Sequence, residues 1–458
     1  MRIHFVGIGG IGISALAQFC HLRGDKVSGS DISETEIFPS LRILNIPIFI
    51  PQKEENITPD IDLLVYSEAI HSANPERSAA GKYKITQKSY FEFLGEISRT
   101  FKTIAVAGSH GKTTITGMLA SGFQTARFDA SIFIGSTLRE FNGSNFHRGT
   151  NEWMLVEACE YRRNFRFLRP EVVVLTQVEW DHPDSYPTKE SYFEAFREFC
   201  AGAKYVIFHA DDEGAQKVLK NFSGVKIPVQ SSHSLKFQLG VFGEHNKRNG
   251  LLALEAAKLL KLDVRKFQEG LSKFTGAGRR QELLGEVGGV KIYDDYGHHP
   301  TEIKAVITAF RAKFPQSRIG LIYEPHQFVR TRQFFDEFIT SLSLADQVAL
   351  FPIYEARDTD EDKAAISINH IIQKIPHSRK IEHSDEVYEF LESLHRGDVL
   401  IFMGAGKISG FAKKFLEKLG LSSSKKQNTS CCPLVEAIGQ ANLFLFPKDK
   451  KDCRVRFR

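Results

Sequence analysis

A glycine-rich loop that leads from an apolar run into a helix-like stretch constrains the fold of this chain most. Residues 103–107 have the length and composition of a buried strand, residues 108–114 contain two glycines, a lysine and two threonines, and residues 115–123 have the pattern of a helix. A strand that passes through such a loop directly into a helix begins a strand–helix–strand unit, whose next strand is parallel to the first. The sequence therefore predicts α/β layers around mostly parallel sheets.

The same alternation continues along the chain of 458 residues. Helix-like stretches include residues 13–22 and residues 246–261, where Asn246 is the expected N-cap. Short apolar runs of strand length occur at residues 3–6, 26–29, 63–66, 153–156, 172–176, 290–293, 319–323, 347–351 and 398–402. At roughly 150 residues per domain, this length allows two to four domains. We expect three, at residues 1–100, 101–276 and 277–421, followed by an appended tail, residues 422–458, of unknown role.

Composition narrows the class of protein. The net charge of +5 is small for this length, and no block of like charge precedes the tail, so nucleic-acid binding is not suggested. No segment approaches the roughly 18 consecutive apolar residues of a membrane-spanning helix, and the N-terminus lacks the pattern of a secretory signal. The six cysteines show no metal-ligand spacing. We expect a cytoplasmic chain with reduced thiols, as a monomer or weak homodimer, without a membrane or nucleic-acid partner.

The loop at residues 108–114 has the composition of a phosphate-binding site. Glycines let backbone N–H groups approach phosphate oxygens, the helix N-terminus adds a favourable dipole, and a lysine adds a positive charge. The residues expected to bind the phosphates of a nucleotide are Gly108, Ser109, His110, Gly111, Lys112, Thr113 and Thr114. The alternative is a tight turn with a solvated lysine. The strand before the loop and the helix after it favour phosphate binding.

A metal ion beside those phosphates needs ligands from the same edge of the sheet. The Thr113 hydroxyl follows the lysine, Glu157 ends a strand-like run, and His182 comes after another. Ligands collect at the carboxyl ends of parallel strands, so these side chains are expected to converge on the loop. An oxygen ligand such as Glu157 suits Mg²⁺, whereas His182 could instead orient a water or a phosphate. Either residue in isolation would more simply be a polar surface group.

The first glycine-rich stretch, residues 7–12, has the spacing of a dinucleotide-binding loop. Gly7, Gly9 and Gly12 occupy the G-x-G-x-x-G positions, and Asp31 follows about 20 residues later, at the end of the second strand-like run. The pattern predicts a diphosphate at a helix N-terminus. It leaves open whether NAD, FAD or a nucleoside-diphosphate sugar carries that diphosphate, and a glycine-rich turn without a ligand is the alternative.

Polar residues also cluster after two strand-like runs of the third segment. Residues 294–302, DDYGHHPTE, follow one run, and residues 324–332, EPHQFVRTR, follow the other. Pro300 and the two residues after it are expected to open a helix. An arginine in the second cluster could hold a carboxylate through two parallel hydrogen bonds. Each residue alone could be a helix cap or a surface group, but their grouping after strands favours a site.

Taken together, these blocks resemble the Mur ligase family of bacterial cell-wall synthesis. The resemblance covers roughly residues 1–420 and rests on an ordered set: GIGGIG at 7–12, GSHGKTT at 108–114, EACEYRR at 157–163, EWDH at 179–182, GEHN at 243–246, GRR at 278–280, DDYGHHPTE at 294–302 and PHQFVRT at 325–331. It implies a three-domain Mur ligase architecture, with a Rossmann-like N-terminal domain that binds a UDP-sugar, a P-loop central domain that binds ATP, and a Rossmann-like C-terminal domain that presents an amino acid.

The blocks are most similar to those of family members that ligate L-alanine to UDP-N-acetylmuramate. The resemblance implies that ATP phosphorylates the lactyl carboxylate and that the L-alanine amine then attacks the acyl phosphate. Lys112, Glu157, His182, His298 and Arg330 are the catalytic candidates it implies. The other implied roles are Mg²⁺ binding by Thr113, Glu157 and His182; ATP binding also by Asn246, Arg280 and Asp295; UDP-sugar binding by Gly7, Gly9, Gly10, Gly12, Asp31 and Ser67; and contact with L-alanine and the muramoyl group by Tyr296, His298 and Arg330.

Three features depart from the family pattern, and three other functions compete with this one. Residues 159–161, CEY, stand where Asp-Glu-Ser is commoner. Gln327 occupies a position where an arginine is common, and the tail matches no family block. The nearest alternative is the murein tripeptide recycling ligase, which acts on the same sugar; the DYGH form of residues 295–298 favours the alanine-adding members. An NAD-dependent oxidoreductase explains only the first glycine loop. A nucleotide switch without amide chemistry leaves the third segment unused.

Overall fold

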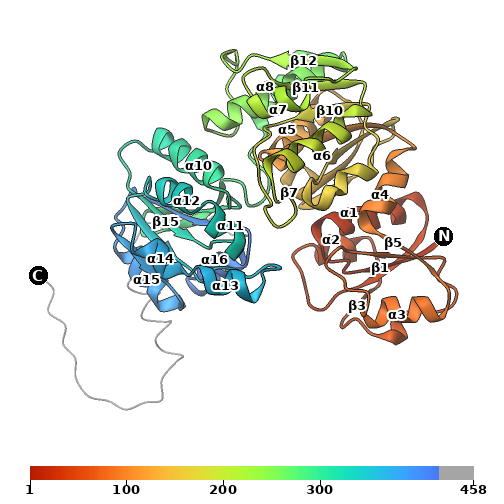
Figure 1. Ribbon diagram of the computed structural model, residues 1–458, viewed down its shortest axis with the longest axis horizontal. Helices are drawn as coiled ribbons and strands as arrows, with labels where there is room; N and C mark the ends of the chain where they lie inside the picture. The colour runs from red at the N-terminus through yellow and green to blue at the C-terminus, as the bar shows by residue number, and fades with distance from the viewer. Residues whose placement is uncertain (422–458) are drawn as a thin grey trace, which may run out of the picture. The chain divides into compact units, whose positions relative to one another are not determined.

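The computed structural model describes residues 1–421 of the chain (Figure 1). By internal packing the chain divides into two units, residues 1–280 and the unit that begins at Gln281. The tail predicted at residues 422–458 lies outside the described residues. Within residues 1–421, no helix is long and apolar enough to cross a membrane.

The first unit begins with a five-stranded parallel sheet in the order β3-β2-β1-β4-β5. Its strands are β1 (Arg2–Val6), β2 (Lys26–Ser30), β3 (Ile48–Phe49), β4 (Leu63–Tyr66) and β5 (Thr86–Ser89). Its helices are α1 (Ile11–Arg23), α2 (Phe38–Ile43), η1 (Glu54–Asn56), α3 (Pro75–Lys82) and α4 (Tyr90–Ser98). The strand order reverses direction between β1 and β4, and the glycine loop of residues 7–12 follows β1, where such sheets bind ligands.

A seven-stranded sheet in the order β12-β11-β10-β6-β9-β7-β8 completes the first unit, and only β7 and β8 are antiparallel. Its strands are β6 (Lys102–Ala107), β7 (Ser131–Leu138), β8 (Ser144–His147), β9 (Trp153–Glu157), β10 (Val172–Leu175), β11 (Tyr205–His209) and β12 (Val225–Val229). Its helical segments are α5 (Lys112–Thr125), η2 (Arg139–Phe141), η3 (Tyr161–Phe167), α6 (Lys189–Ala201), α7 (Glu213–Val218), α8 (Glu244–Leu259) and α9 (Val264–Lys273).

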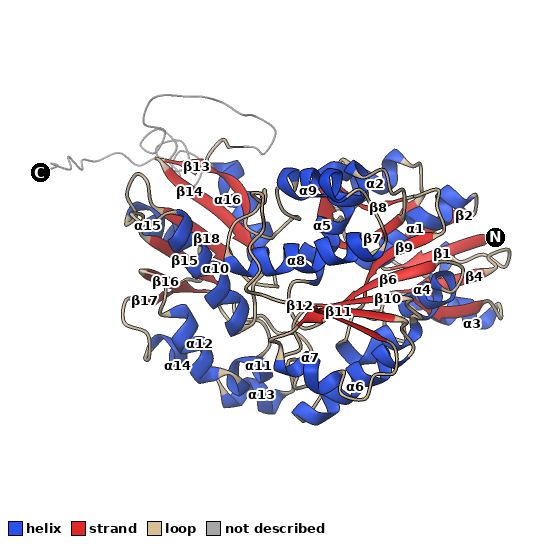
Figure 2. Cartoon of the chain, turned by 90° about the horizontal axis from the view of Figure 1, so that it is seen from above, coloured by secondary structure: helices blue, strands red, loops and turns tan. Residues whose placement is uncertain are grey.

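The central strand β6 is buried on both faces, as expected for a parallel sheet covered by helices. Side chains alternate between the faces of a strand. Ile104 and Val106 pack into one core with α5, α8 and α9, whereas Ala105 and Ala107 pack into a second core that includes α6. Figure 2 shows α5, α8 and α9 on one side of this sheet and α6 on the other. The glycine loop between β6 and α5 therefore begins from a rigid strand.

The second core continues from the seven-stranded sheet into the five-stranded one. Phe19 of α1 lies 5.6 Å from Phe133 of β7 and 6.0 Å from Phe146 of β8, measured between ring centroids. Beside them, the buried amide of Asn145 donates to Ser14 Oγ at 2.9 Å and its oxygen accepts from Gln18 Nε2 at 2.8 Å. Apolar contacts and satisfied buried hydrogen bonds thus fix α1 against the β7–β8 hairpin.

The second unit contains a six-stranded sheet in the order β13-β14-β18-β15-β16-β17, in which only β13 and β14 are antiparallel. Its strands are β13 (Glu282–Val287), β14 (Val290–Asp295), β15 (Ile319–Tyr323), β16 (Gln347–Leu350), β17 (Ser378–Lys380) and β18 (Val399–Met403). Its helices are α10 (Pro300–Lys313), α11 (Phe328–Gln333), α12 (Phe335–Leu342), α13 (Asp360–Ala365), α14 (Ile368–Ile372), α15 (Ser384–Glu392) and α16 (Ile408–Lys418).

The predicted fold class is confirmed, and one local prediction is wrong. Mostly parallel sheets covered by helices recur in both units, and α10 begins at Pro300 as the sequence indicates. Asn246, however, is not an N-cap. Helix α8 begins at Glu244 and is capped by Gly243, whose φ of 103° is a conformation that glycine adopts without strain. Asn246 therefore lies inside the first turn, and its Nδ2 donates to Phe242 O at 2.8 Å.

Candidate active site

The loop after β6 has the conformation that a phosphate site requires. Gly108 and Gly111 have φ of 133° and 81°, values that favour glycine. A Cβ on Gly108 would lie 1.9 Å from Thr176 Oγ1, so no larger residue fits this position. Gly111 is the N-cap of α5, which places Lys112 and Thr113 in the first helical turn. The helix N-terminus, with its favourable dipole, thus lies in the predicted phosphate loop.

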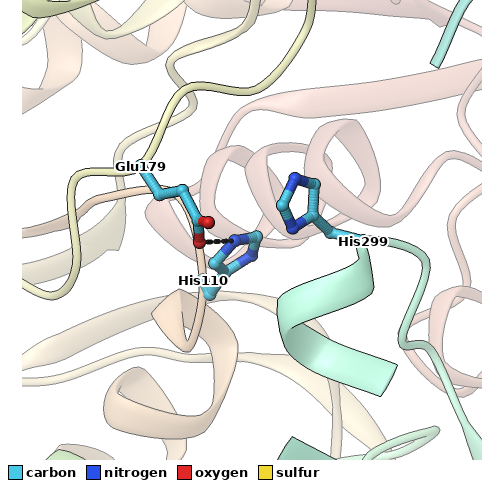
Figure 3. Close-up of side chains that lie close together, drawn as sticks. All are labelled: His110, Glu179 and His299. Carbon is cyan, nitrogen blue, oxygen red and sulfur yellow. Dashed lines mark ion pairs between the residues drawn. The ribbon is translucent and has the colours of Figure 1, made fainter. Parts of the chain in front are cut away.

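Two other loop residues contact the segment that follows β10. The Ser109 backbone N–H donates to Gln177 O at 2.7 Å, and its hydroxyl donates to Glu179 O at 2.6 Å. His110 Nε2 lies 3.2 Å from Glu179 Oε2, and Figure 3 shows the two side chains facing each other. Ser109 therefore holds the loop in place through its own hydrogen bonds. Its predicted contact with phosphate remains a prediction.

Lys112 and His182 both contact the carboxylate of Glu160. Lys112 Nζ lies 2.8 Å from Glu160 Oε2, and His182 Nε2 lies 3.3 Å from Glu160 Oε1. Burial alone lowers the pKa of Lys112 and raises that of Glu160, but the attraction between them reverses both effects. The pKa of Lys112 is raised and that of Glu160 is lowered. The pair is therefore ionised, and Lys112 carries the charge that phosphate binding needs.

Thr113 and Glu157, two of the three residues predicted to bind Mg²⁺, are in contact. Thr113 Oγ1 donates to Glu157 Oε2 at 2.9 Å, and the Gly135 N–H donates to Oε1 at 2.5 Å. Burial raises the pKa of Glu157, opposed by these two donors and by the charges of Lys112 and Arg280. A hydroxyl and a carboxylate side by side are the oxygen ligands that Mg²⁺ prefers, so the residues fit this ion. His182, the third predicted ligand, is held by Glu160.

The N-terminal glycine loop lies across a cavity from Glu157. The Gly9 N–H donates to Asp31 Oδ2 at 2.9 Å, and Gly10 is the N-cap of α1. A cavity of about 360 Å³ is lined by the loop, including Gly12, by Ser67 after β4, and on the other side by Glu157. Its size is within the range of small-molecule sites, roughly 300–1,000 Å³. The structure thus brings Gly10, Gly12 and Ser67, three of the residues predicted to bind the UDP-sugar, to one cavity with Glu157.

In the second unit, the predicted residues gather at the carboxyl ends of β14 and β15. Tyr296 and His298 have ring centroids 5.4 Å apart, and His298 lies 6.1 Å from His326. Arg330 is buried, with Nη1 3.4 Å from both Nδ1 and the backbone oxygen of His326. Asp295 is also buried, and its carboxylate accepts the N–H groups of residues 281 and 297, each at 2.8 Å. Tyr296, His298 and Arg330 therefore share one polar cluster with His326.

Gln327, which departs from the expected pattern, has a structural role in this cluster. It is buried, with a φ of 72°, and caps α11. Its backbone N–H donates to Tyr354 O at 3.0 Å, and its Nε2 donates to Ala356 O at 3.1 Å. These bonds hold the turn before α11 against residues 354–356. Gln327 thereby fixes the helix that carries Arg330.

Family models match the chain along most of its length. The Mur ligase family catalytic domain matches residues 2–102, the Mur ligase middle domain matches residues 106–232, and the Mur ligase glutamate ligase domain matches residues 279–406. The UDP-N-acetylmuramate–L-alanine ligase of Agathobacter rectalis is 34% identical over 457 residues, which cover 91% of this chain and 98% of that protein. The chain belongs to the Mur ligase family. This confirms the resemblance seen in the ordered sequence blocks.

Solved Mur ligase structures share the fold. The UDP-N-acetylmuramate–alanine ligase of Thermotoga maritima has a TM-score of 0.77 and 27% identity, covering 93% of this chain and all of that one, 100%. The murein peptide ligase of Psychrobacter arcticus has a TM-score of 0.70 and 23% identity, covering 91% of this chain and 98% of that one, and this likeness concerns the fold alone.

Sequence reasoning gave no role to three residues that shape this Mur ligase site. Glu160 pairs with Lys112, and the Gly135 N–H binds Glu157. Asn249 reaches the phosphate loop, because a Cβ on Gly111 would lie 2.9 Å from its Oδ1. Glu160 stands inside a quoted family block, and Asn249 is three residues from Asn246 on the same helix face. Gly135 is in an unremarkable strand and gave no signal.

Proposed function

We propose that this Mur ligase joins L-alanine to the lactyl carboxylate of UDP-N-acetylmuramate, with ATP as energy source, in peptidoglycan precursor synthesis. The observation that carries the proposal is a cavity lined both by residues 10–12 of the N-terminal glycine loop and by Glu157, whose carboxylate contacts Thr113 of the phosphate loop. A carboxylate tethered to a diphosphate in this cavity would reach the nucleotide phosphates.

The chemistry explains why a phosphate loop is needed to form an amide. A carboxylate is a poor acyl donor because its oxide is a poor leaving group. A lactyl oxygen attacks the γ-phosphorus of ATP, the bond from that phosphorus to the bridging oxygen breaks, and ADP leaves. The L-alanine amine attacks the acyl carbon and loses a proton, and the bond from that carbon to the phosphate oxygen breaks to release phosphate. In phosphoryl transfer, enzymes act mainly by positioning and charge stabilisation.

Residues of the first unit fit the first step. Lys112 is ionised at the start of α5 and would neutralise charge on the phosphoryl group. Thr113 and Glu157 would hold Mg²⁺, which when bound supplies further neutralisation of phosphate charge. Gly10 begins α1, whose N-terminus would bind the diphosphate of the sugar nucleotide. Asn246 and Arg280 are proposed to contact ATP, as is Asp295.

Residues of the second unit fit the amine-accepting step. Tyr296, His298 and Arg330 are proposed to receive L-alanine and the muramoyl group. A guanidinium such as that of Arg330 can hold a carboxylate through two parallel hydrogen bonds, and its burial strengthens them. ATP and nucleotide sugars are cytoplasmic metabolites, so we propose the cytoplasm as the location. The oligomeric state, monomer or weak homodimer, stays a prediction.

Two alternative functions account for fewer of these observations. A tripeptide-adding ligase shares the fold, but the 34% identical relative is named for L-alanine. An NAD-dependent oxidoreductase has no use for the ionised Lys112 or for the Thr113–Glu157 pair.

Phosphate release from ATP tests the proposal. The full chain would be assayed with Mg²⁺ and UDP-N-acetylmuramate, with L-alanine, with a tripeptide that begins with L-alanine, or with no amine. The proposal predicts release that requires both the sugar nucleotide and free L-alanine. Release driven by the tripeptide instead would assign the chain to the recycling reaction, and no release with either amine would contradict ligase function.

A further inference from the structure

Glu160 is a buried carboxylate that no predicted role includes. Only 3% of its side chain is exposed, yet it lies between two catalytic candidates, Lys112 and His182. The ammonium of Lys112 also donates to Gly108 O at 2.6 Å and to Ser109 O at 3.2 Å. Together with Glu160, these oxygens surround the ammonium with acceptors. The lysine is thus directed to one place in the loop before any phosphate binds.

The backbone around Glu160 is held as firmly as its side chain. The Tyr186 hydroxyl and the Arg163 N–H, at 2.8 Å for the latter, both donate to the Glu160 carbonyl oxygen. Two residues further on, Arg162 and Arg163 have φ of 51° and 58°, a left-handed conformation that is strained for residues other than glycine. Such strain persists where the surrounding structure imposes it, often at functional sites. The turn therefore places the carboxylate at a fixed point.

This arrangement has an electrostatic consequence for nucleotide binding. A paired lysine and carboxylate have no net charge, so the pair attracts a phosphate far less than a lone ammonium would. An unpaired buried ammonium, however, would follow the ground-state phosphates wherever they bind. Catalysis gains from groups placed where charge develops in the transition state, and not from tighter binding of the ground state.

We propose that Glu160 is a positioning residue: it fixes the Lys112 ammonium and the His182 imidazole for phosphoryl transfer, and in doing so it weakens nucleotide binding. This rests on the proposed function, because it assumes that the loop binds ATP. A carboxylate that merely neutralised a buried lysine would have no such effect on turnover. The two roles therefore differ in measurable ways.

The test is Glu160→Gln, which keeps the shape of the side chain and an oxygen acceptor for Lys112 but removes the charge. Two quantities are measured on the full chain: the Kd for ADP in EDTA, by calorimetry, and kcat for phosphate release with all substrates. We expect the Kd to fall about three- to tenfold while kcat falls about 10- to 100-fold. Unchanged or weaker ADP binding together with an unchanged kcat would overturn the proposal.

Two further variants complete the test. Glu198→Gln removes an exposed carboxylate that pairs with Arg163 of the same turn at 2.7 Å, and it should leave both quantities unchanged. Glu160→Asp keeps the charge but withdraws it by one methylene, so kcat should fall while the ADP Kd stays within about twofold. If Glu160→Gln does not fold, a wild-type kcat in Glu160→Asp still overturns the proposal. Wild-type chain that neither binds ADP nor releases phosphate would instead contradict the proposed function itself.

Discussion

Replacing Lys112 with methionine should destabilise the first unit as well as slow turnover. Methionine keeps an unbranched side chain but removes the charge that pairs with Glu160. The Glu160 side chain is only 3% exposed, so the pair is buried. Breaking a buried ion pair by removing one partner typically costs about 3–5 kcal/mol. The value here should be near the lower end, about 3 kcal/mol, because His182 Nε2 lies 3.3 Å from the same carboxylate and can donate a hydrogen bond to it.

The double variant Lys112→Met/Glu160→Gln separates charge from packing. It removes both charges of the pair, so we expect the free energy of unfolding to fall by only about 1 kcal/mol, about 2 kcal/mol less than in the single variant. At about 2 °C per kcal/mol for a unit of this size, the single variant should unfold about 6 °C lower and the double variant about 2 °C lower, by calorimetry without ligands. Both should lose about 10²–10³-fold in kcat.

The loss of stability in Lys112→Met should depend on pH, because Glu160 titrates differently with and without its partner. In the wild type the folded pKa of Glu160 is lowered, so its stabilisation is present above the unfolded pKa, about 4.3, and is lost as pH falls. Without Lys112, burial dominates and raises that pKa, so stability is highest at low pH and is lost as pH rises. The difference in Tm between wild type and Lys112→Met should therefore shrink from pH 7 to pH 5. A constant difference, or a single variant as stable as wild type, would refute this reasoning.

Four further predictions concern other parts of the chain. Thr113→Val removes the hydroxyl beside the Glu157 carboxylate and should raise the Mg²⁺ concentration needed for half-maximal activity about tenfold, with little change in Tm; an unchanged Mg²⁺ requirement would argue against the proposed ligand role. Arg330→Lys should raise KM for L-alanine at least about tenfold and leave ADP affinity unchanged, because lysine lacks the planar fork. Asn145→Ala should lower the free energy of unfolding by about 1–3 kcal/mol, since it leaves buried partners unsatisfied; calorimetry would detect this. Burial lowers the pKa of His209 to about 4, whereas its unfolded pKa is about 6.5. The free energy of unfolding of the wild type should therefore fall by about 2 kcal/mol between pH 7 and pH 5, and His209→Asn should not show this fall.

Local patterns predicted the parts of this fold that depend on neighbouring residues. A strand, a glycine loop and a helix follow one another within residues 102–125, so the sequence alone indicates the parallel sheet and the phosphate loop. Even so, the start of α8 was predicted two residues late, because Gly243 can begin a helix in a conformation that the Asn246 cap pattern does not anticipate. Helix boundaries depend on such single dihedral angles.

Contacts between residues far apart in the sequence could not be predicted from local sequence patterns. Asn145 meets Ser14 across 131 positions, and Glu160 meets Lys112 across 48, and no periodicity links them. The position of Glu160 depends on a left-handed turn at Arg162 and Arg163, which are not residues that favour that conformation. The site residues that the sequence predicted therefore stand mostly within the family's sequence blocks. The contact of Glu160 with Lys112 could be identified only from the folded structure.

The acyl phosphate is the central claim of this account, and an oxygen label tests it most directly. UDP-N-acetylmuramate labelled with ¹⁸O in both lactyl carboxylate oxygens would be incubated with ATP, Mg²⁺, L-alanine and the full chain, and the released phosphate would be analysed by mass spectrometry. We expect one ¹⁸O atom in each phosphate, because a carboxylate oxygen leaves with the phosphoryl group. Phosphate without ¹⁸O, released together with the alanyl product, would show that the carboxylate is not phosphorylated and would contradict the account.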